Sequence, residues 1–546
     1  MNAKHRFLSL SVAVLTPVLS FSSCQKAIKD EQEEPKRPNI ILIMSDDMGY
    51  SDLGCYGGEI NTPNLDKLAA NGLQFTQFYN TARCCPTRAS LMTGLYPHQT
   101  GIGHMTNPPQ SDHHDYELPG YRGALSQHTI TLAEQLKGAG YQTMMTGKWH
   151  LGMEEERMWP LQRGFDKFYG ILAGAANFYS PTFPRGITEQ NDTTAIHDPD
   201  YYTTDAFTDK AIEFIDKGQQ KEPFFLYLAY NAPHWPIQAP KEDVDKYRER
   251  YRNGWGQLRE ERYKRMKKMG LIREDWPLSP QDSNGWDSLD GAKKDEMALR
   301  MAIYAAMVDR MDQNIGKLMD YLESRGELDN TVIMFMNDNG ACAEGGPLGG
   351  GPAEQLETKK GYFLTYGRSW ANASNTPFRE YKHWIHEGGI ATPFIVHWPE
   401  GIKDTRKGTR VDAYGHLPDI MATFIDLSMS EYPATKNGKA LPKLEGESLL
   451  PLIAGNGEMD RDKPIFWEHE GNKGVREDNL KLVMKWDNEA EQHWELYDME
   501  KDRTELHDLS GEMPDKVEEM AALWQEWAAA NQVEPWDKIQ KILSSK

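Results

Sequence analysis

Short apolar runs alternate with helical patterns along most of the chain. Residues 39–44, 224–230 and 332–336 are largely apolar, which predicts strands that are buried on both faces. Further strands are predicted at 75–79, 142–146 and 392–397. Residues 62–72, 131–137 and about 296–323 have the apolar spacing of helices that pack on one face. We therefore expect the α/β fold class, with a large mixed, mostly parallel sheet sandwiched by helices.

Two parts of the chain depart from this alternation. Residues 241–294 are rich in charge and contain Trp255, Trp276 and Trp286, so we interpret them as an insertion with short helices near the mouth of the functional site. Short strands at 465–468, 480–484 and 494–497, followed by a helix at 514–530, predict a smaller C-terminal α+β domain over 464–546. The large α/β domain is then expected to span 38–463.

The first residues predict export. A positive start at residues 4–6 precedes an apolar run over 7–19, which is typical of a secretory signal peptide over 1–23. Because Cys24 follows where the run ends, we favour lipid attachment to Cys24, with 24–37 as a polar tether. An ordinary signal peptide with an incidental cysteine is the alternative. We expect an exported protein, periplasmic or anchored to the outer membrane of a bacterium, with no other contact to a membrane.

The net charge narrows the class of partner, and the cysteine content bears on disulfide bonding. The net charge of −21 argues against nucleic acid, because nucleic-acid-binding proteins carry a basic surface. An anionic substrate would require a locally positive pocket within this acidic protein. The five cysteines are an odd and sparse set, so we expect no disulfide framework. The neighbours Cys84 and Cys85 are not expected to bridge to each other.

Polar side chains follow four of the predicted strands, where ligands of open α/β sheets bind. In chain order they are Asp46, Asp47, Lys148, His150, His234, Asp338 and Asn339. The three aspartates and the asparagine offer only oxygen, which suits calcium or magnesium better than zinc. The histidines are then free for acid–base chemistry. An Asp-Asp pair alone is often only a loop or a helix cap, but four such segments together predict one site.

Residues 84–88 read CCPTR and predict the start of a helix. Pro86 suits the first helical turn, and Gly94 is a stop signal after Thr93. Cys84 would lie at the helix N-terminus, where the helix dipole and free amides favour an anion. These features allow a thiolate nucleophile of low pKa. A pair of buried structural cysteines is the alternative.

The segment Cys84-x-Pro86-x-Arg88, followed by Ala-Ser-Leu-Met-Thr-Gly, resembles the signature of the formylglycine-dependent (type I), arylsulfatase-like sulfatases of the alkaline-phosphatase-like superfamily. Residues 140–152 (GYQTMMTGKWHLG) resemble the second signature of that family. Residues 232–236 (APHWP), 336–340 (MNDNG) and 381–389 (YKHWIHEGG) are similar to its other active-site segments, and 496–509 to its C-terminal domain. The matches follow the family order over most of the chain. The insertion at 241–294 and the loop at 341–380 lie outside these motifs.

The resemblance implies sulfate-ester hydrolysis with one calcium ion per chain and a formylglycine made from Cys84. One hydroxyl of the hydrated aldehyde would attack sulfur, and the other would then expel sulfate from a covalent intermediate. The implied metal ligands are Asp46, Asp47, Cys84, Asp338 and Asn339. Arg88 and Lys148 would hold the diol, and Asp338 would deprotonate the attacking hydroxyl.

The remaining implied roles concern proton transfer. His150 would be the base for the elimination, and His234 and Lys382 would bind sulfate and protonate the leaving oxygen. The implied partners are a sulfated glycan or small molecule and a formylglycine-maturing enzyme. We expect a sulfated glycan first, because an exported enzyme meets polymers, and an aryl sulfate second.

Three alternatives to a sulfatase remain. They are a phosphonate or phosphate-ester hydrolase of the same superfamily, a catalytically dead glycan-binding lipoprotein and a plain cysteine hydrolase. Trp235, Trp255 and Trp286 are candidates both for stacking on sugar rings and for ordinary packing. The sequence assigns no role to four further histidines, which are His98, His104, His383 and His386.

Overall fold

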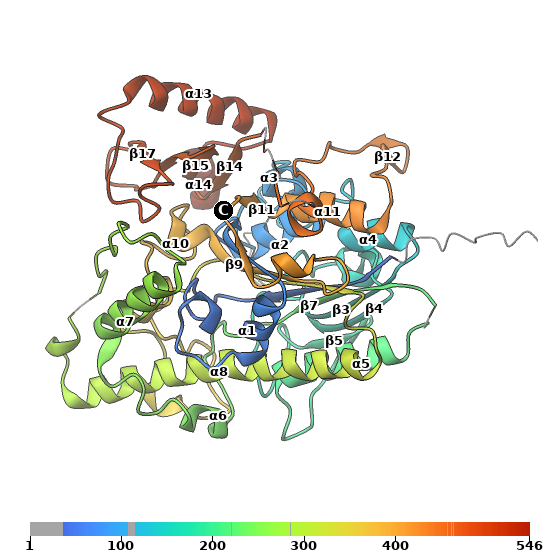
Figure 1. Ribbon diagram of the computed structural model, residues 1–546, viewed down its shortest axis with the longest axis horizontal. Helices are drawn as coiled ribbons and strands as arrows, with labels where there is room; N and C mark the ends of the chain where they lie inside the picture. Colours follow the sequence, from blue (N-terminus) through green and yellow to red (C-terminus); the bar gives the residue numbers. More distant parts are fainter. Residues whose placement is uncertain are drawn as a thin grey trace, which may run out of the picture. The chain divides into compact units, whose positions relative to one another are not determined.

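The computed structural model describes residues 37–106, 115–219, 221–283, 285–455, 457–459, 461 and 463–545 (Figure 1). The predicted signal peptide, Cys24 and nearly all of the tether lie outside the described residues, so these expectations stay predictions. Among the helices described, none combines the length and apolar character needed to cross a membrane.

A large mixed sheet forms the centre of the fold. Its order is β10-β2-β9-β8-β1-β7-β3-β4-β5-β6, with β11 beside β2. The five strands from β8 to β4 are parallel, whereas β9 runs antiparallel to both of its neighbours. The strands are β1 (Asn39–Ser45), β2 (Leu73–Tyr79), β3 (Gln142–Lys148), β4 (Lys167–Ile171), β5 (Ile187–Glu189), β6 (Asp192–Thr194), β7 (Phe224–Ala229), β8 (Thr331–Asn337), β9 (Ala391–His397), β10 (Thr409–Val411) and β11 (Gly415–His416). The predicted fold class is confirmed.

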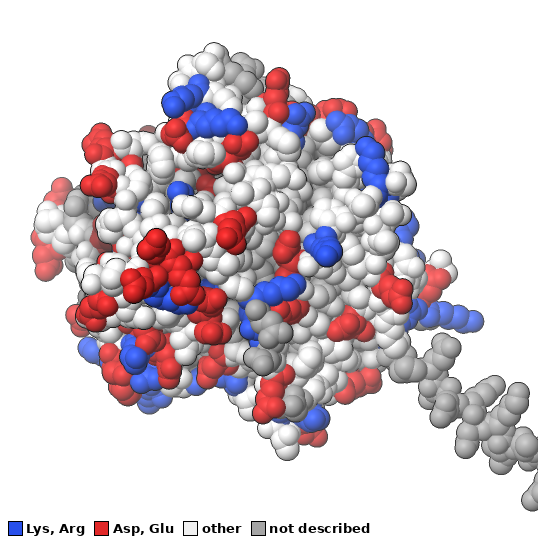
Figure 2. Space-filling model, turned by 90° about the horizontal axis from the view of Figure 1, so that it is seen from above, with Lys and Arg blue, Asp and Glu red and all other residues white. Residues whose placement is uncertain are grey.

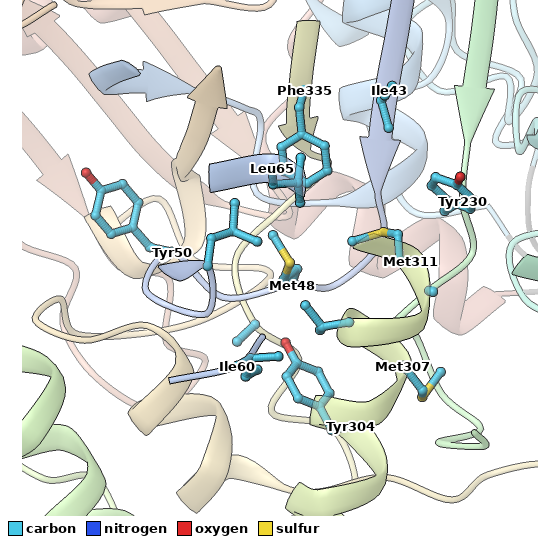
Figure 3. Packing of buried hydrophobic residues seen from close by; sticks show 14 of the residues in the cluster. Ile43, Met48, Tyr50, Ile60, Leu65, Tyr230, Tyr304, Met307, Met311 and Phe335 are labelled. Atoms are coloured by element: carbon cyan, nitrogen blue, oxygen red, sulfur yellow. The ribbon is translucent and has the colours of Figure 1, made fainter. Parts of the chain in front are cut away.

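The central strands are apolar throughout because helices cover both faces of the sheet. Along β1, Ile41 and Ile43 belong to one hydrophobic cluster, while Ile40, Leu42 and Met44 belong to the other. The first face packs against α1 (Pro63–Ala70), α5 (Thr203–Asp216) and the long α8 (Gly291–Ser324). Figure 3 shows this cluster, with Ile43 and Phe335 from the strands beside methionines of α8. The second face packs against α2 (Cys84–Thr93), α4 (Leu132–Gly138) and α11 (Pro418–Ser428).

A second, antiparallel sheet lies near the C-terminus. It contains β14 (Ile465–His469), β15 (Asn472–Glu477), β16 (Leu480–Met484) and β17 (Glu495–Asp498), in that order. Helix α13 (Pro514–Ala530) covers it through Trp524 and Trp527, and α14 (Trp536–Ser545) follows. Three of these strands and α13 were predicted, whereas β15 was not, because its charged and glycine residues hide the alternation.

The charged segment at 241–294 contains α6 (Lys241–Asp245) and α7 (Gly254–Met269), so α7 is longer than the expected short helices. It is firmly packed, since the buried Arg262 lies 2.6 Å from Asp52 and 2.8 Å from Glu59. Trp255 is buried against Trp286 and Trp370, so its role is packing. The remaining short elements are α3 (Pro97–Thr100), α9 (Arg368–Ser374), α10 (Glu387–Ile390), α12 (Leu450–Ile453), β12 (Thr435–Lys436) and β13 (Lys439–Ala440).

Candidate active site

Four adjacent strands of the large sheet end at one edge and deliver polar side chains to it. In the order β8-β1-β7-β3, Ser45 pairs with Asn337, and Ala229 pairs with both Met44 and Gly147. The residues that follow are therefore neighbours in space although they are far apart in sequence. The backbone N–H of Asp46 donates to the carbonyl of Ala232, and that of Asp338 donates to the carbonyl of Ser45.

Two buried aspartates at this edge are joined by two buried cations. The Lys148 ammonium lies 3.0 and 2.8 Å from the two carboxylate oxygens of Asp46. Arg88, which projects from α2, donates to Asp338 Oδ2 from Nε at 3.2 Å and from Nη2 at 2.8 Å. Its Nη2 also lies 3.8 Å from Asp46. All four side chains are fully buried, so their positions are fixed by one another rather than by solvent.

Asp47 is the centre of a second group of contacts. Lys382 Nζ lies 2.9 and 3.0 Å from its two carboxylate oxygens, and His234 Nε2 lies 3.4 Å from Oδ2. Asn339 Nδ2 donates to Asp47 Oδ1 at 2.7 Å. Asp47 has a φ of 67°, a left-handed backbone conformation that non-glycine residues adopt rarely and often at functional sites. This turn directs Asp46 and Asp47 to different partners within the same cavity.

Cys84 is the first residue of α2 and is fully buried. Its Sγ and ligand atoms of Asp46, Asp47 and His234 all lie within 4.8 Å of one another. Burial raises the pKa of the Cys84 thiol, against the opposing effect of Lys148 and Lys382. The unmodified side chain is therefore a neutral thiol rather than the thiolate of low pKa that the helix position alone allows.

His150 lies at the margin of this cluster, just beyond β3. Its Nε2 is 3.3 Å from the carbonyl oxygen of Thr106, which places the ring proton on Nε2. The buried Nδ1 has no hydrogen-bond partner among the described residues. Burial, with the charges of Lys148 and Arg88, holds the pKa of His150 well below its usual value. The ring is consequently neutral and presents a free lone pair. Gly174 leaves room for it, because a Cβ there would lie 2.5 Å from His150 Cε1.

The electrostatics differ from one carboxylate to the next. Burial and the neighbouring Asp338 raise the pKa of Asp46 well above its ordinary value. Burial also acts to raise the pKa of Asp47, but Lys382 and His234 outweigh this effect and hold the pKa of Asp47 low. Burial lowers the pKa of His234 to about 3, so this ring is neutral at pH 7. Its Nδ1 lies 2.6 Å from the Trp235 carbonyl and carries the proton.

The donor set suits a hard divalent cation. Asp46, Asp47, Asp338 and Asn339 present carboxylate and amide oxygens to one cavity, the ligand type that calcium prefers. Asn339 uses its Nδ2 for Asp47 and for the carbonyl of Gly340, whereas its buried Oδ1 has no hydrogen-bond partner among the described residues. An orphaned buried acceptor beside three carboxylates is the feature expected of a cation ligand.

Sequence reasoning missed several side chains of the site. Glu344 accepts a hydrogen bond from Trp235 Nε1 at 2.7 Å and lies 3.2 Å from Arg83 and 3.8 Å from Lys382. The Tyr227 hydroxyl lies 3.4 Å from Arg88 Nη1. Neither residue carried a signal, because Glu344 belongs to the loop at 341–380 that no motif explains and Tyr227 lies within an apolar strand.

Three of the four unassigned histidines pair with carboxylates outside the cluster. His98 lies 2.7 Å from Glu468, His386 lies 3.1 Å from Glu495 and His383 lies 3.4 Å from Glu470. The three buried cations of the site, Arg88, Lys148 and Lys382, are each paired with one of its aspartates. The face seen in Figure 2, by contrast, carries acidic and basic side chains interspersed.

Comparison with known proteins identifies relatives over nearly the whole chain. A family model described as Sulfatase matches residues 38–429, and a model described as N-sulphoglucosamine sulphohydrolase, C-terminal, matches residues 379–532. An arylsulfatase of Klebsiella aerogenes is 34% identical over 77% of this chain and 91% of the relative. An N-acetylglucosamine-6-O-sulfatase of Bacteroides thetaiotaomicron is 28% identical over 93% of this chain and 88% of the relative.

The fold is also similar to that of a solved protein with a bound saccharide. The crystal structure of Ps i-CgsB in complex with k-i-k-neocarrahexaose has a TM-score of 0.67 and 27% sequence identity, and it covers 92% of this chain and 95% of that chain. The match extends over nearly all of both chains.

Proposed function

Because the chain belongs to the sulfatase family and is a sulfuric ester hydrolase, we propose that it removes O-sulfate groups from saccharides by means of a formylglycine at position 84 and a bound calcium ion. The observation that supports the chemistry best is the meeting of Cys84 with three carboxylates and three buried cations at the carboxyl edge of the sheet. The saccharide substrate is supported by the glycan sulfatase and the saccharide complex among the related proteins.

Asp46, Asp47, Asp338 and Asn339 would hold the calcium ion, together with the modified residue 84. When bound, the ion would supply positive charge that neutralises sulfate oxygens. The orphaned Oδ1 of Asn339 supports this assignment. Arg88 and Lys148 are buried cations on the other side of Asp46 and Asp338, where they would stabilise the charge that develops during the reaction.

The hydrate of the formylglycine would supply the attacking hydroxyl. Asp338 is our candidate to take its proton, since it is a buried carboxylate whose position is fixed by Arg88 at Oδ2 and by the backbone N–H of Asp47 at Oδ1. His150 is suited to accept a later proton, because Thr106 holds the ring proton on Nε2 and Nδ1 stays free.

The leaving oxygen requires a proton from the opposite side of the cavity. The Trp235 carbonyl fixes a proton on Nδ1 of His234, so Nε2 is the ring atom that faces the pocket. Lys382 reaches the same carboxylate of Asp47 from a different segment and carries three protons. We therefore assign binding of the sulfate to this pair and protonation of the leaving oxygen to Lys382; in the neutral ring Nε2 of His234 holds no proton, so His234 would have to gain one there before it could donate.

An aryl sulfate is the second candidate substrate, which the arylsulfatase relative favours. The first experiment compares hydrolysis of 4-nitrophenyl sulfate, 4-nitrophenyl phosphate and a panel of O-sulfated saccharides. We expect the sulfate esters to be cleaved much faster than the phosphate, and at least one saccharide to be desulfated. Release of nitrophenol without desulfation of any saccharide would leave the aryl sulfate as the substrate, and faster phosphate cleavage would refute both.

The location of the enzyme also remains a proposal. The pattern of residues 1–24 supports export and a lipid anchor on Cys24. Labelling of growing cells with a fatty-acid analogue would test it, since Cys24→Ala should abolish the label without changing the specific activity of the folded enzyme.

A further inference from the structure

An unusual strip of aromatic side chains leads from the catalytic cavity to the surface. It begins at Trp235, whose ring lies 4.6 Å from that of His234 and whose Nε1 donates to Glu344, the carboxylate next to Lys382. Phe363 and Tyr362 continue it, with ring centroids 5.0 and 6.1 Å from that of Trp235. The mechanism uses none of these three rings.

The outer rings of the strip face solvent. Tyr362 is 58% exposed and Phe363 is 38% exposed, and Phe183 in the adjoining loop is 80% exposed. These are three of the six large hydrophobic side chains that are exposed among the described residues; the others are Met429, Leu506 and Met513. Exposed aromatic side chains that gather beside a catalytic site indicate a binding surface, because the described part of the chain has no other aromatic residue among its exposed large hydrophobic side chains.

A cation with unused hydrogen-bond donors lies within the strip. The Arg185 guanidinium is 4.8 Å from the ring centroid of Tyr362 and 5.6 Å from that of Trp235. Its Nε and Nη1 are buried, and neither has a hydrogen-bond partner among the described residues. A guanidinium keeps its charge in this setting and is well shaped for a sulfate or a carboxylate. The exposed Lys359 and Lys360 add positive charge nearby within an acidic protein.

The backbone that carries these rings is held in place. Asn177 Nδ2 donates to the carbonyls of Lys359 and Gly361, each at 3.2 Å. Gln238 Nε2 donates to the carbonyl of Lys360 at 3.0 Å, and the N–H of Ile237 donates to the carbonyl of Leu364 at 2.8 Å. The segment 359–364 is therefore fixed both to the loop before Arg185 and to the segment after Trp235, which makes the strip a preorganised surface.

We propose that Trp235, Tyr362, Phe363 and Arg185 form a subsite for the sugar unit next to the one that carries the scissile sulfate. The rings would stack on the apolar face of that sugar, and Arg185 would bind an anionic group on it, either a sulfate or a carboxylate. The occupant is the substrate itself, since the strip adjoins the catalytic cluster through the contact of Trp235 with His234 and its charge is complementary to an anionic polymer. This inference rests on the proposed saccharide function and adds to it a preference for oligosaccharides over single sulfated sugars.

The test compares kcat/KM for a sulfated monosaccharide and for a tetrasaccharide with the same terminal unit. Tyr362→Ala should lower kcat/KM about five- to tenfold on the tetrasaccharide and change it less than about twofold on the monosaccharide. Tyr321→Ala is the matched control, because Tyr321 stacks with Arg325 at 5.7 Å near the end of α8, next to the amino end of β8. Thermal unfolding of each variant checks folding.

Two tetrasaccharides that differ only in the second sugar, neutral or anionic, test the role of Arg185. Arg185→Gln should reduce kcat/KM on the anionic form and remove most of the preference for it, whereas Arg325→Gln should not. Separate sulfate and carboxylate versions of the second sugar identify which anion is bound.

The outcomes separate the subsite from the function on which it rests. Equal losses on monosaccharide and tetrasaccharide, or no loss on either, would overturn the subsite while the saccharide sulfatase stands. If the wild-type enzyme cleaves 4-nitrophenyl sulfate but desulfates no saccharide, both proposals are wrong.

Discussion

Two networks of buried charged side chains in this chain differ in how far their hydrogen-bonding groups are satisfied within the protein. At the C-terminal sheet, Lys481 lies 3.0 Å from Glu387 and 2.7 Å from Glu505, and Arg503 lies 2.7 Å from Glu387. One nitrogen of Arg503 lacks a hydrogen-bond partner, but this guanidinium lies 4.8 Å from the ring centroid of Phe378. These contacts join β16 to two other segments: one follows Lys382, and the other follows β17.

The network at the carboxyl edge of the large sheet leaves several groups unsatisfied. Asn339 Oδ1 and His150 Nδ1 are buried and have no hydrogen-bond partner among the described residues. Burial of charge alone therefore does not identify a functional site. The difference lies in unused donors and acceptors that point to one place, which the C-terminal network has used for its own cohesion.

The largest expected effect separates the two adjacent cysteines. Cys84→Ala should lower turnover at least about a thousandfold, because the nucleophile is lost. Cys85→Ala should keep substantial activity, since its Sγ makes hydrogen bonds only to the segment 104–106, outside the catalytic cluster. Mass spectrometry of the peptide containing 84–88, from protein made with a maturing enzyme, should place formylglycine at 84. Fully active protein with an unmodified Cys84 would refute the mechanism.

Removal of the metal should affect the network at the carboxyl edge of the large sheet and not the C-terminal network. Metal analysis of the purified enzyme should find about one calcium ion per chain. Exhaustive chelation should abolish hydrolysis of 4-nitrophenyl sulfate and lower Tm, because an ion that binds only the folded state stabilises it. Added calcium should restore both. Stoichiometric zinc, or full activity with no retained metal, would contradict the assignment.

Substitution in the C-terminal network should lower the stability of the protein and leave its catalytic activity unchanged. Lys481→Met leaves two buried carboxylates with one fewer cation, and we expect the free energy of unfolding to fall by about 3–5 kcal/mol. The turnover number of the folded variant should match that of the wild type. Lys473→Met on the neighbouring β15 is the control, since this lysine lies over Trp524 and has no ion pair within 4 Å among the described residues, and its loss should cost about 0.5–1 kcal/mol. If urea unfolding gives equal losses of unfolding free energy for the two variants, the network contributes little to stability.

The smallest effect concerns a buried titratable group outside both networks. Burial lowers the pKa of His397 to about 4, whereas an unfolded chain gives about 6.5. Between these values the unfolded chain binds the extra proton, so the stability that His397 contributes is present above pH 6.5 and is lost as the pH falls toward 4. His397→Asn should reduce the pH dependence of unfolding by at most about 1.4 kcal/mol per pH unit.

The sequence predicts those features that depend on local patterns. Continuous apolar runs identified three of the parallel strands, β1, β7 and β8, because helices cover both faces, whereas the parallel β4 was not predicted. The polar residues that follow the predicted strands identified one edge. The antiparallel direction of β9 has no local signal, since it depends on pairing with both β8 and β2. The sequence did not predict roles for Glu344 and Tyr362 for a related reason. Their loop has no regular hydrophobic period, and contacts with distant residues fix its shape. The assigned roles of the site residues stay predictions until tested.

The central position of β1 has a consequence for the order of events during synthesis. Ile40 pairs with Phe225, and Asn39 pairs with Thr331, so the first strand of the chain obtains its second neighbour only after more than half of the protein has been made. Such distant pairings are slow to form. Until then the segment with Cys84 has no completed cavity around it. A maturing enzyme would therefore have access to a nascent chain at a residue that the finished protein buries completely.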